Sequence, residues 1–158
     1  MKKYKLVALG GTFDILHRGH LELLRKGFDI SSRVIIGLTS DELAKKRGKH
    51  LIHGYTQRYE TLEDVIERNF PNISYKISKL ENDFGPAVLE KEVEALVVSE
   101  ETAFQGNELN LLRRKRNSPD VDVVVVPMVL AKDGKRISTS RIKTSEIDSD
   151  GNIIAVDK

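Results

Sequence analysis

Residues Gly10 to His20 read Gly-Gly-Thr-Phe-Asp-Ile-Leu-His-Arg-Gly-His, and this stretch gives the first indication of the fold. The apolar run Lys5–Leu9 precedes it, and Leu21, Leu24 and Phe28 follow it at helical spacing. The stretch therefore joins a strand to a helix through glycines, as the first unit of an α/β sheet does. In such sheets ligands bind outside the carboxyl ends of the strands, where the positive N-terminus of the following helix points. We expect an α/β fold with an anion site at this edge of the sheet.

The rest of the chain repeats this alternation. Short β-branched runs predict strands, and longer amphipathic or charged stretches between them predict helices. The expected strands are Lys5–Leu9, Arg33–Thr39, Ile73–Ile77, Ala95–Ser99 and Val121–Val126. The expected helices are Gly19–Asp29, a helix capped by Thr56 that ends near Phe70, Pro86–Glu94 and Gly106–Arg116. Several of the strands are apolar on both faces, so we expect a parallel sheet that is covered by helices on each side.

The length of 158 residues fits one domain. We assign residues 1–148 to that domain and residues 149–158 to a C-terminal tail. The tail contains Ile153–Val156, which could be a frayed end or a small edge strand. We therefore expect the phosphate site to belong to a single α/β domain.

Composition argues against several classes of protein. Hydrophobic residues make up 39% of the chain and charged residues 32%, and the apolar run Val121–Leu130 is interrupted by Asp122 and Pro127, so we expect no membrane span. Residues 1–11 lack the long apolar region and cleavage site of a signal peptide, so we expect a cytoplasmic protein. The absence of cysteine excludes disulfides, thiolate metal ligands and cysteine nucleophiles. A net charge of +2 and the lack of tryptophan give no indication of a nucleic-acid partner.

Within the Gly10 to His20 stretch, the residue types suit a phosphate. Gly10 and Gly11 would let a phosphate approach the backbone, and Thr12 offers a hydroxyl and nearby amides. His17 and His20 are three residues apart at the start of the expected helix, so their imidazoles share a face. The stretch is neither a Walker loop nor the dinucleotide-binding fingerprint. The alternative is purely structural, with turn glycines, an exposed His17 and a capping His20.

These residues resemble the nucleotidyltransferase superfamily, whose hallmark is Thr/His-x-Gly-His. His17-Arg18-Gly19-His20 matches that hallmark in full, and Gly11–Asp14 matches the residues that flank it. The second hallmark is a serine- and threonine-rich stretch that opens the last catalytic helix, and Ile137–Ile142 resembles it. The resemblance implies the fold of the superfamily, which is a doubly wound, five-stranded parallel sheet of the Rossmann-like type.

A finer resemblance concerns the substrate. Val97–Thr102 and Gly106–Asn110, with the basic helix that follows, are similar to phosphopantetheine adenylyltransferases of the archaeal and eukaryotic kind. That resemblance implies transfer of the adenylyl group of ATP to 4'-phosphopantetheine, which gives dephospho-coenzyme A and pyrophosphate in coenzyme A biosynthesis. Cytidylyltransferases usually carry Arg-Thr-x-Gly before the second hallmark, where this chain has Lys132–Arg136. The alternatives that stay open are a cytidylyltransferase for a small phosphorylated alcohol, a nicotinamide-mononucleotide adenylyltransferase and a non-catalytic nucleotide sensor.

The resemblance also implies roles for individual residues. The catalytic set is His20, His17, Thr12 and Lys45. The nucleotide-binding set is Gly10, Gly11, Thr12, Phe13, His17, His20, Ser99, Asn107, Glu108, Ile137, Ser138, Thr139, Ser140 and Arg141. The acceptor-binding set is Thr12, Lys45 and Arg58. Lys46 and Lys49 are further candidates for the cation, and the alternative for all these basic residues is ordinary surface charge.

An acceptor phosphate is ionised at neutral pH and needs no general base, so the protein has only to position the reactants and offset their charge. Mg²⁺ is expected to arrive with ATP, because no set of carboxylates resembles a metal cage. His50 and His53 are interpreted as loop residues, and Arg113–Arg116 as a solvated helix face. The oligomeric state stays open, with a monomer as the simplest expectation.

Overall fold

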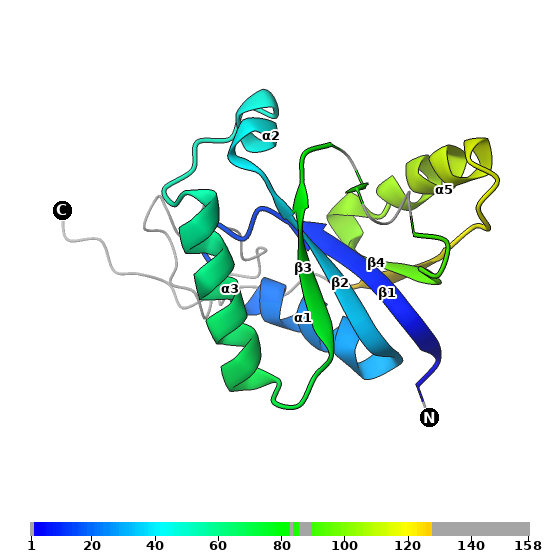
Figure 1. Cartoon of the computed structure of the whole chain (residues 1–158), viewed down its shortest axis with the longest axis horizontal. Coiled ribbons are helices and arrows are strands. Elements are labelled where there is room, and N and C mark those ends of the chain that lie inside the picture. Colours follow the sequence, from blue (N-terminus) through cyan, green and yellow to red (C-terminus); the bar gives the residue numbers. More distant parts are fainter. Residues whose placement is uncertain (1, 83, 86–89, 128–158) are drawn as a thin grey trace.

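Strand β1 (Tyr4–Gly11) lies at the centre of a sheet in which all five strands are parallel (Figure 1). The computed structural model describes residues 2–82, 84, 85 and 90–127. The strand order is β3-β2-β1-β4-β5. The other strands are β2 (Ser31–Thr39), β3 (Tyr75–Leu80), β4 (Ala95–Ser99) and β5 (Asp122–Val126).

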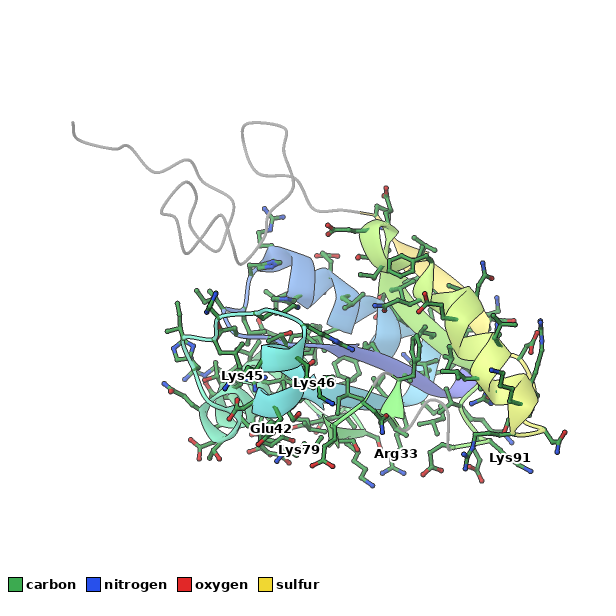
Figure 2. All side chains as sticks on the ribbon, turned by 90° about the horizontal axis from the view of Figure 1, so that it is seen from above. Arg33, Glu42, Lys45, Lys46, Lys79 and Lys91 are labelled. Carbon is green, nitrogen blue, oxygen red and sulfur yellow. The ribbon has the colours of Figure 1, made fainter. Side chains whose placement is uncertain are left out.

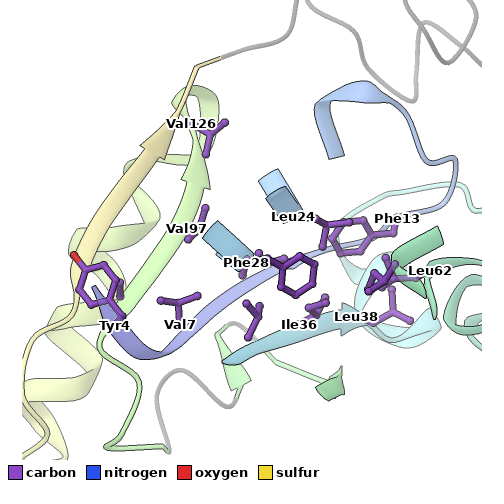
Figure 3. Packing of buried hydrophobic residues seen from close by; sticks show 14 residues of the cluster. Tyr4, Val7, Phe13, Leu24, Phe28, Ile36, Leu38, Leu62, Val97 and Val126 are labelled. Carbon is purple, nitrogen blue, oxygen red and sulfur yellow. The ribbon is translucent and has the colours of Figure 1, made fainter. Parts of the chain in front are cut away.

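Helices cover both faces of this sheet. They are α1 (Arg18–Ile30), α2 (Asp41–Lys46), α3 (Tyr55–Asn69), the 3-10 helix η1 (Glu100–Thr102) and α5 (Gln105–Lys115). On one face, Leu24 of α1 and Leu62 of α3 are buried in a core with Val7 of β1 (Figure 3). On the other face, Leu109 of α5 is buried with Ala8, the next residue of β1. Two cores on opposite faces confirm the expected doubly wound, five-stranded sheet.

The winding of the chain reverses at β1, and this reversal positions the site. Strands β2 and β4 pair with β1 on either side. Strand β4 pairs with β1 through Val7 with Ala95 and Ala8 with Leu96, and it ends at Ser99. A ligand that binds beyond the carboxyl ends of the strands at this switch point therefore meets the residues that follow Gly11.

Helix α3 begins earlier than predicted. Its N-cap is Gly54 and not Thr56, and its first helical residue is Tyr55. The carboxylate of Asp41 accepts a hydrogen bond from the Tyr55 amide at 3.3 Å and so provides the acceptor that a capping side chain would give. Because Asp41 belongs to α2, the local pattern around Thr56 could not show this cap.

Strand β3 begins later and runs further than predicted. It starts at Tyr75 rather than Ile73 and continues through the polar Ser78 and Lys79 to Leu80. Strand β3 is at the edge of the sheet, where polar side chains can reach solvent. The apolar pattern used to find buried strands therefore misplaces both of its ends.

Other predictions fall partly or wholly outside the part of the chain that the structure describes. The helix predicted over Pro86–Glu94 is not helical at residues 90–94, and residues 86–89 lie outside the description. The predicted domain boundary at residue 148 and the predicted tail 149–158 also lie outside the described residues. Among the described residues, no helix combines the length and the apolar character that crossing a membrane requires.

The basic cluster on α5 is not uniformly solvated, which corrects the prediction for Arg113. The residue is 0% exposed. Its guanidinium donates to the carbonyls of Pro119 at 2.7 Å, Glu90 at 3.0 Å and Val93 at 3.2 Å. The neighbouring Arg114 is exposed and pairs with Asp120, as expected for a surface charge. Arg113 thus joins α5 to the loops that enter β4 and β5.

Candidate active site

The residues after β1 form a tight turn with an unusual backbone. Phe13 has φ of +50°, a left-handed value that residues other than glycine rarely adopt. Its side chain is buried, and the centroid of its ring lies 5.0 Å from that of His20. A β-carbon on Gly11 would lie 3.2 Å from the Phe13 ring, so the glycine makes room for the aromatic side chain. Backbone strain held in place by packing is typical of functional sites.

His17 and His20 cap helix α1 reciprocally. Nδ1 of His17 accepts a hydrogen bond from the Gly19 amide at 3.1 Å, and Nδ1 of His20 accepts one from the His17 amide at 3.3 Å. The two rings stack with their centroids 3.9 Å apart. A β-carbon on Gly19 would lie 2.9 Å from the His17 ring, so glycine is needed between the histidines. The motif is therefore assembled at a helix N-terminus, where amides and the helix dipole favour an anion.

These hydrogen bonds decide which nitrogen of each ring carries the proton. An Nδ1 that accepts from an amide carries no proton, so each ring is neutral with its proton on Nε2. Desolvation of the His20 ring, together with nearby His17 and Lys49, lowers the pKa of His20 to about 3. The residue keeps some solvent exposure, yet its ring lies against those of Phe13 and His17. At neutral pH His20 is therefore an uncharged hydrogen-bond donor through Nε2–H.

Lys49 reaches the turn from the segment that follows α2. Its Nζ donates to the Thr12 hydroxyl at 3.0 Å. Gly48, with φ of +73°, follows the end of α2, and the Lys49 amide bonds back to the Ala44 carbonyl at 3.0 Å. Lys45, the predicted cation, lies with Lys46 on the exposed surface of α2 (Figure 2). The helix end thus brings Lys49, and not Lys45, to Thr12.

Arg58, predicted to bind the acceptor, is buried beneath the turn. Its side chain is 0% exposed. Nη1 donates to the Thr12 carbonyl at 2.8 Å, Nε to the His53 carbonyl at 3.1 Å and Nη2 to the Asp41 carboxylate at 2.8 Å. The Arg58 guanidinium holds the pKa of Asp41 below its usual value. This burial rules out the alternative of surface charge, and the contacts show that Arg58 supports the turn from below.

Asp14 and His53 form a contact that the sequence analysis missed. The buried Asp14 carboxylate accepts the amides of Ile52 and His53, each at 3.0 Å. Nδ1 of His53 lies 2.9 Å from the Asp14 carbonyl oxygen, which can only accept, so this Nδ1 carries a proton. The signal in the sequence was an aspartate between Phe13 and Ile15, because a carboxylate that is buried among apolar side chains must find donors.

The other predicted nucleotide-binding residues lie on β4, on α5 or outside the described residues. Ser99 ends β4, and its hydroxyl lies 3.1 Å from that of Thr102. Asn107 and Glu108 are exposed in the first turn of α5. The predicted second hallmark, Ile137–Arg141, lies outside the described residues. Over the part of the chain that the structure describes, no group of three or more histidine, aspartate and glutamate side chains could hold a metal ion.

Comparisons with known proteins identify relatives of this chain. The cytidylyltransferase-like family matches residues 8–145. The chain is 40% identical over 153 residues to the phosphopantetheine adenylyltransferase of Methanothermobacter thermautotrophicus, covering 97% of this chain and 92% of the relative. It is 42% identical over 154 residues to the phosphopantetheine adenylyltransferase of Pyrococcus furiosus, covering 97% of this chain and 96% of the relative. A solved structure of a protein of unknown function from Archaeoglobus fulgidus is similar, with a TM-score of 0.69 and 32% identity over 77% of this chain and 88% of that one.

Proposed function

This chain belongs to the cytidylyltransferase-like family and, within it, to the phosphopantetheine adenylyltransferases, and from this we propose that it transfers the adenylyl group of ATP to 4'-phosphopantetheine. The products are dephospho-coenzyme A and pyrophosphate, which makes the protein a transferase of coenzyme A biosynthesis. One observation carries the proposal for the site itself. Two neutral histidines stack at the N-terminus of α1, next to a turn that contains Thr12.

The reaction is a displacement at the α-phosphorus of ATP. An oxygen of the acceptor phosphate forms the new bond to that phosphorus, the bond to the bridging oxygen breaks, and pyrophosphate leaves with that oxygen. The acceptor phosphate is already ionised, so no side chain has to remove a proton. The protein must supply position, and donors for the charge on the phosphate oxygens.

The residues of the turn meet these two needs. His20 donates Nε2–H to the charge that develops on the α-phosphate, and His17 donates to the β- and γ-phosphates. Both rings are neutral before the reaction, so they can donate hydrogen bonds throughout without giving up a proton. Thr12 and Lys49, joined at 3.0 Å, orient the acceptor phosphate and offset its charge.

The remaining roles follow the resemblance. Ser99, Asn107 and Glu108 would border the nucleotide, while Ile137–Arg141 would hold the leaving pyrophosphate. Mg²⁺ would be held by the oxygens of the triphosphate and would offset part of their charge. We further propose a cytoplasmic protein that acts as a monomer on these small molecules, with neither nucleic acid nor membrane as a partner.

Product analysis tests the proposed function. The purified protein is incubated with Mg²⁺, 4'-phosphopantetheine and each nucleoside triphosphate in turn, and pyrophosphate and the coupled product are measured by mass spectrometry. We expect dephospho-coenzyme A with ATP. A cytidylyl product with CTP and a phosphorylated alcohol, or an adenylyl product with nicotinamide mononucleotide alone, would replace the proposal by one of those activities. ATP binding without any product would leave a nucleotide sensor.

A further inference from the structure

Three contacts hold the end of β1 and the turn that follows it. In each, a side chain of a later segment donates to a backbone carbonyl of this stretch. The pairs are Thr39 with Gly11 at 3.1 Å, Arg58 with Thr12 at 2.8 Å and His53 with Asp14 at 2.9 Å. The Thr12 carbonyl in particular faces the buried guanidinium of Arg58.

The direction of a carbonyl decides the direction of the amide that follows it. A peptide unit is planar and trans, so the Thr12 C=O and the Phe13 N–H point in opposite directions. Arg58 lies on the buried side of the Thr12 carbonyl, and the Phe13 N–H consequently points away from the interior. Phe13 holds φ of +50°, a conformation that persists only where the surroundings enforce it. Arg58 is one of the groups that enforce it.

Arg58 is itself fixed by a full set of contacts. Its Nη2 donates to Asp41 at 2.8 Å, and its guanidinium carbon lies 5.7 Å from the centroid of the Tyr55 ring. Its Nε donates to the carbonyl of His53 at 3.1 Å. The three nitrogens of the planar guanidinium donate to three different acceptors. A lysine ammonium has a single nitrogen and cannot reproduce that geometry.

The same guanidinium also joins the two halves of the acceptor-phosphate site. The Thr12 carbonyl belongs to the turn, whereas His53 belongs to the segment between α2 and α3. That segment carries Lys49, which donates to the Thr12 hydroxyl at 3.0 Å. Loss of the Arg58 guanidinium would therefore loosen the turn and the lysine segment relative to each other.

We propose that Arg58 is a positioning residue of the adenylyl transfer. It touches neither substrate, directs the Phe13 N–H toward a phosphate oxygen, and keeps Thr12 and Lys49 together at the acceptor phosphate. This inference rests on the proposed function for its substrates, while the orientation of the turn rests on the contacts alone.

The kinetic test compares Arg58→Lys with Arg68→Lys on the same helix. Arg68 pairs with Asp64 at 3.1 Å and its side chain is 76% exposed, which makes it the matched control. We expect Arg58→Lys to lower kcat/KM for 4'-phosphopantetheine by about 10- to 100-fold and to raise its KM. KM for ATP should stay nearly unchanged. A purely structural role would lower kcat in proportion to lost folded protein and leave both KM values unchanged, and that result would overturn the proposal.

A spectroscopic test separates this inference from the proposed function. The Phe13 amide resonance of ¹⁵N-labelled protein is followed by NMR while Mg²⁺ and ATP are added. We expect a shift in the wild type and in Arg68→Lys, and its loss in Arg58→Lys. Equal shifts in all three proteins, or no shift in the wild type, would overturn the inference. If the wild type makes no dephospho-coenzyme A but its Phe13 response requires Arg58, the proposed function fails and the positioning role stands.

Discussion

Two buried arginines lie at opposite ends of the parallel strands, Arg58 of α3 near their carboxyl ends and Arg113 of α5 near their amino ends. They are 1% and 0% exposed, and both donate to backbone carbonyls of distant segments. The acceptors of Arg58 include Thr12, in the turn that follows the carboxyl end of β1. Those of Arg113 include Glu90 and Pro119, in the loops that precede β4 and β5. Hydrogen bonds from a buried guanidinium to backbone carbonyls therefore support the site at the carboxyl ends of the strands, whereas at the amino ends they support only stability.

The largest effect on stability should come from Arg113→Met. The change leaves several buried carbonyls without a donor, and we expect the free energy of unfolding to fall by about 3–5 kcal/mol. Urea unfolding measures this loss. The matched control is Arg114→Met, which removes an exposed pair with Asp120 and should leave the urea midpoint nearly unchanged. A change in kcat/KM per folded molecule in Arg113→Met would contradict the conclusion that Arg113 serves stability alone.

His20→Ala should have the largest effect on the reaction. It removes one donor to the charge on the α-phosphate, and we expect kcat to fall by about 100- to 1,000-fold. Thermal unfolding and the product assay are measured on the same sample. Glu22→Gln, which removes only a surface pair with Arg25 on the same helix, serves as control and should retain full activity. Wild-type kcat in His20→Ala would remove His20 from the mechanism.

His20 could be found from the sequence, whereas the roles of the two arginines could not. The histidine motif is local, since its spacing, its glycine and its place between a strand and a helix are all visible within residues 10–20. Arg58 and Arg113 look like any other charge on an amphipathic helix. Their burial depends on acceptors 46 residues away for Arg58 and 23 residues away for Arg113. Only the folded chain shows which arginine serves the site.

Gly19→Ala should disturb the site by displacing the His17 ring, which also caps helix α1. Alanine favours a helix over glycine, so the stability of α1 should not fall for that reason. The added β-carbon would lie 2.9 Å from the His17 ring and must displace it from its stack with His20. We expect kcat/KM to fall by about 10- to 100-fold. A variant that keeps both full activity and wild-type stability would show that the ring stack is not needed.

Lys49→Ala should raise KM for the acceptor by about 10-fold, whereas Lys45→Ala should change it little. The reason is the 3.0 Å contact of Lys49 with Thr12, which Lys45 on the exposed surface of α2 does not share. Lys26→Ala, an exposed change on α1, controls for the loss of one positive charge. The larger effect in Lys45→Ala would restore the residue that the sequence analysis selected.

The central strands and the edge of the sheet differ in how well sequence reasoning describes them. Strand β4 has the bounds that were predicted, because Ala95–Ser99 is an apolar run closed in by neighbours on both sides. Strand β3 was misplaced because its polar edge residues resemble a loop. The sequence likewise does not show which lysine faces Thr12, because that depends on the chain reversal at Gly48. Local patterns identify buried elements, and long-range contacts decide what lies at their ends.

Protonation of His20 should also limit stability in acid. The pKa of His20 in the folded protein is about 3, below the ordinary value of 6.5. Between these two pH values the unfolded chain is protonated at His20, whereas the folded protein is not. Stability contributed by the neutral ring is full above about pH 6.5 and is lost as the pH falls toward about 3. Urea unfolding between those values, in wild type and His20→Ala, isolates this contribution. An equal loss of stability in both proteins would contradict the lowered pKa.

The account depends most on neutral, Nε2-protonated histidines at the start of α1. The direct measurement is the ¹⁵N NMR spectrum of the His17 and His20 rings, recorded with and without Mg²⁺ and ATP from about pH 8 to about pH 5. We predict that His20 stays neutral with its proton on Nε2 throughout this range, and that its Nε2–H resonance shifts when ATP binds. A His20 ring that titrates near 6.5, or carries its proton on Nδ1, would contradict the account.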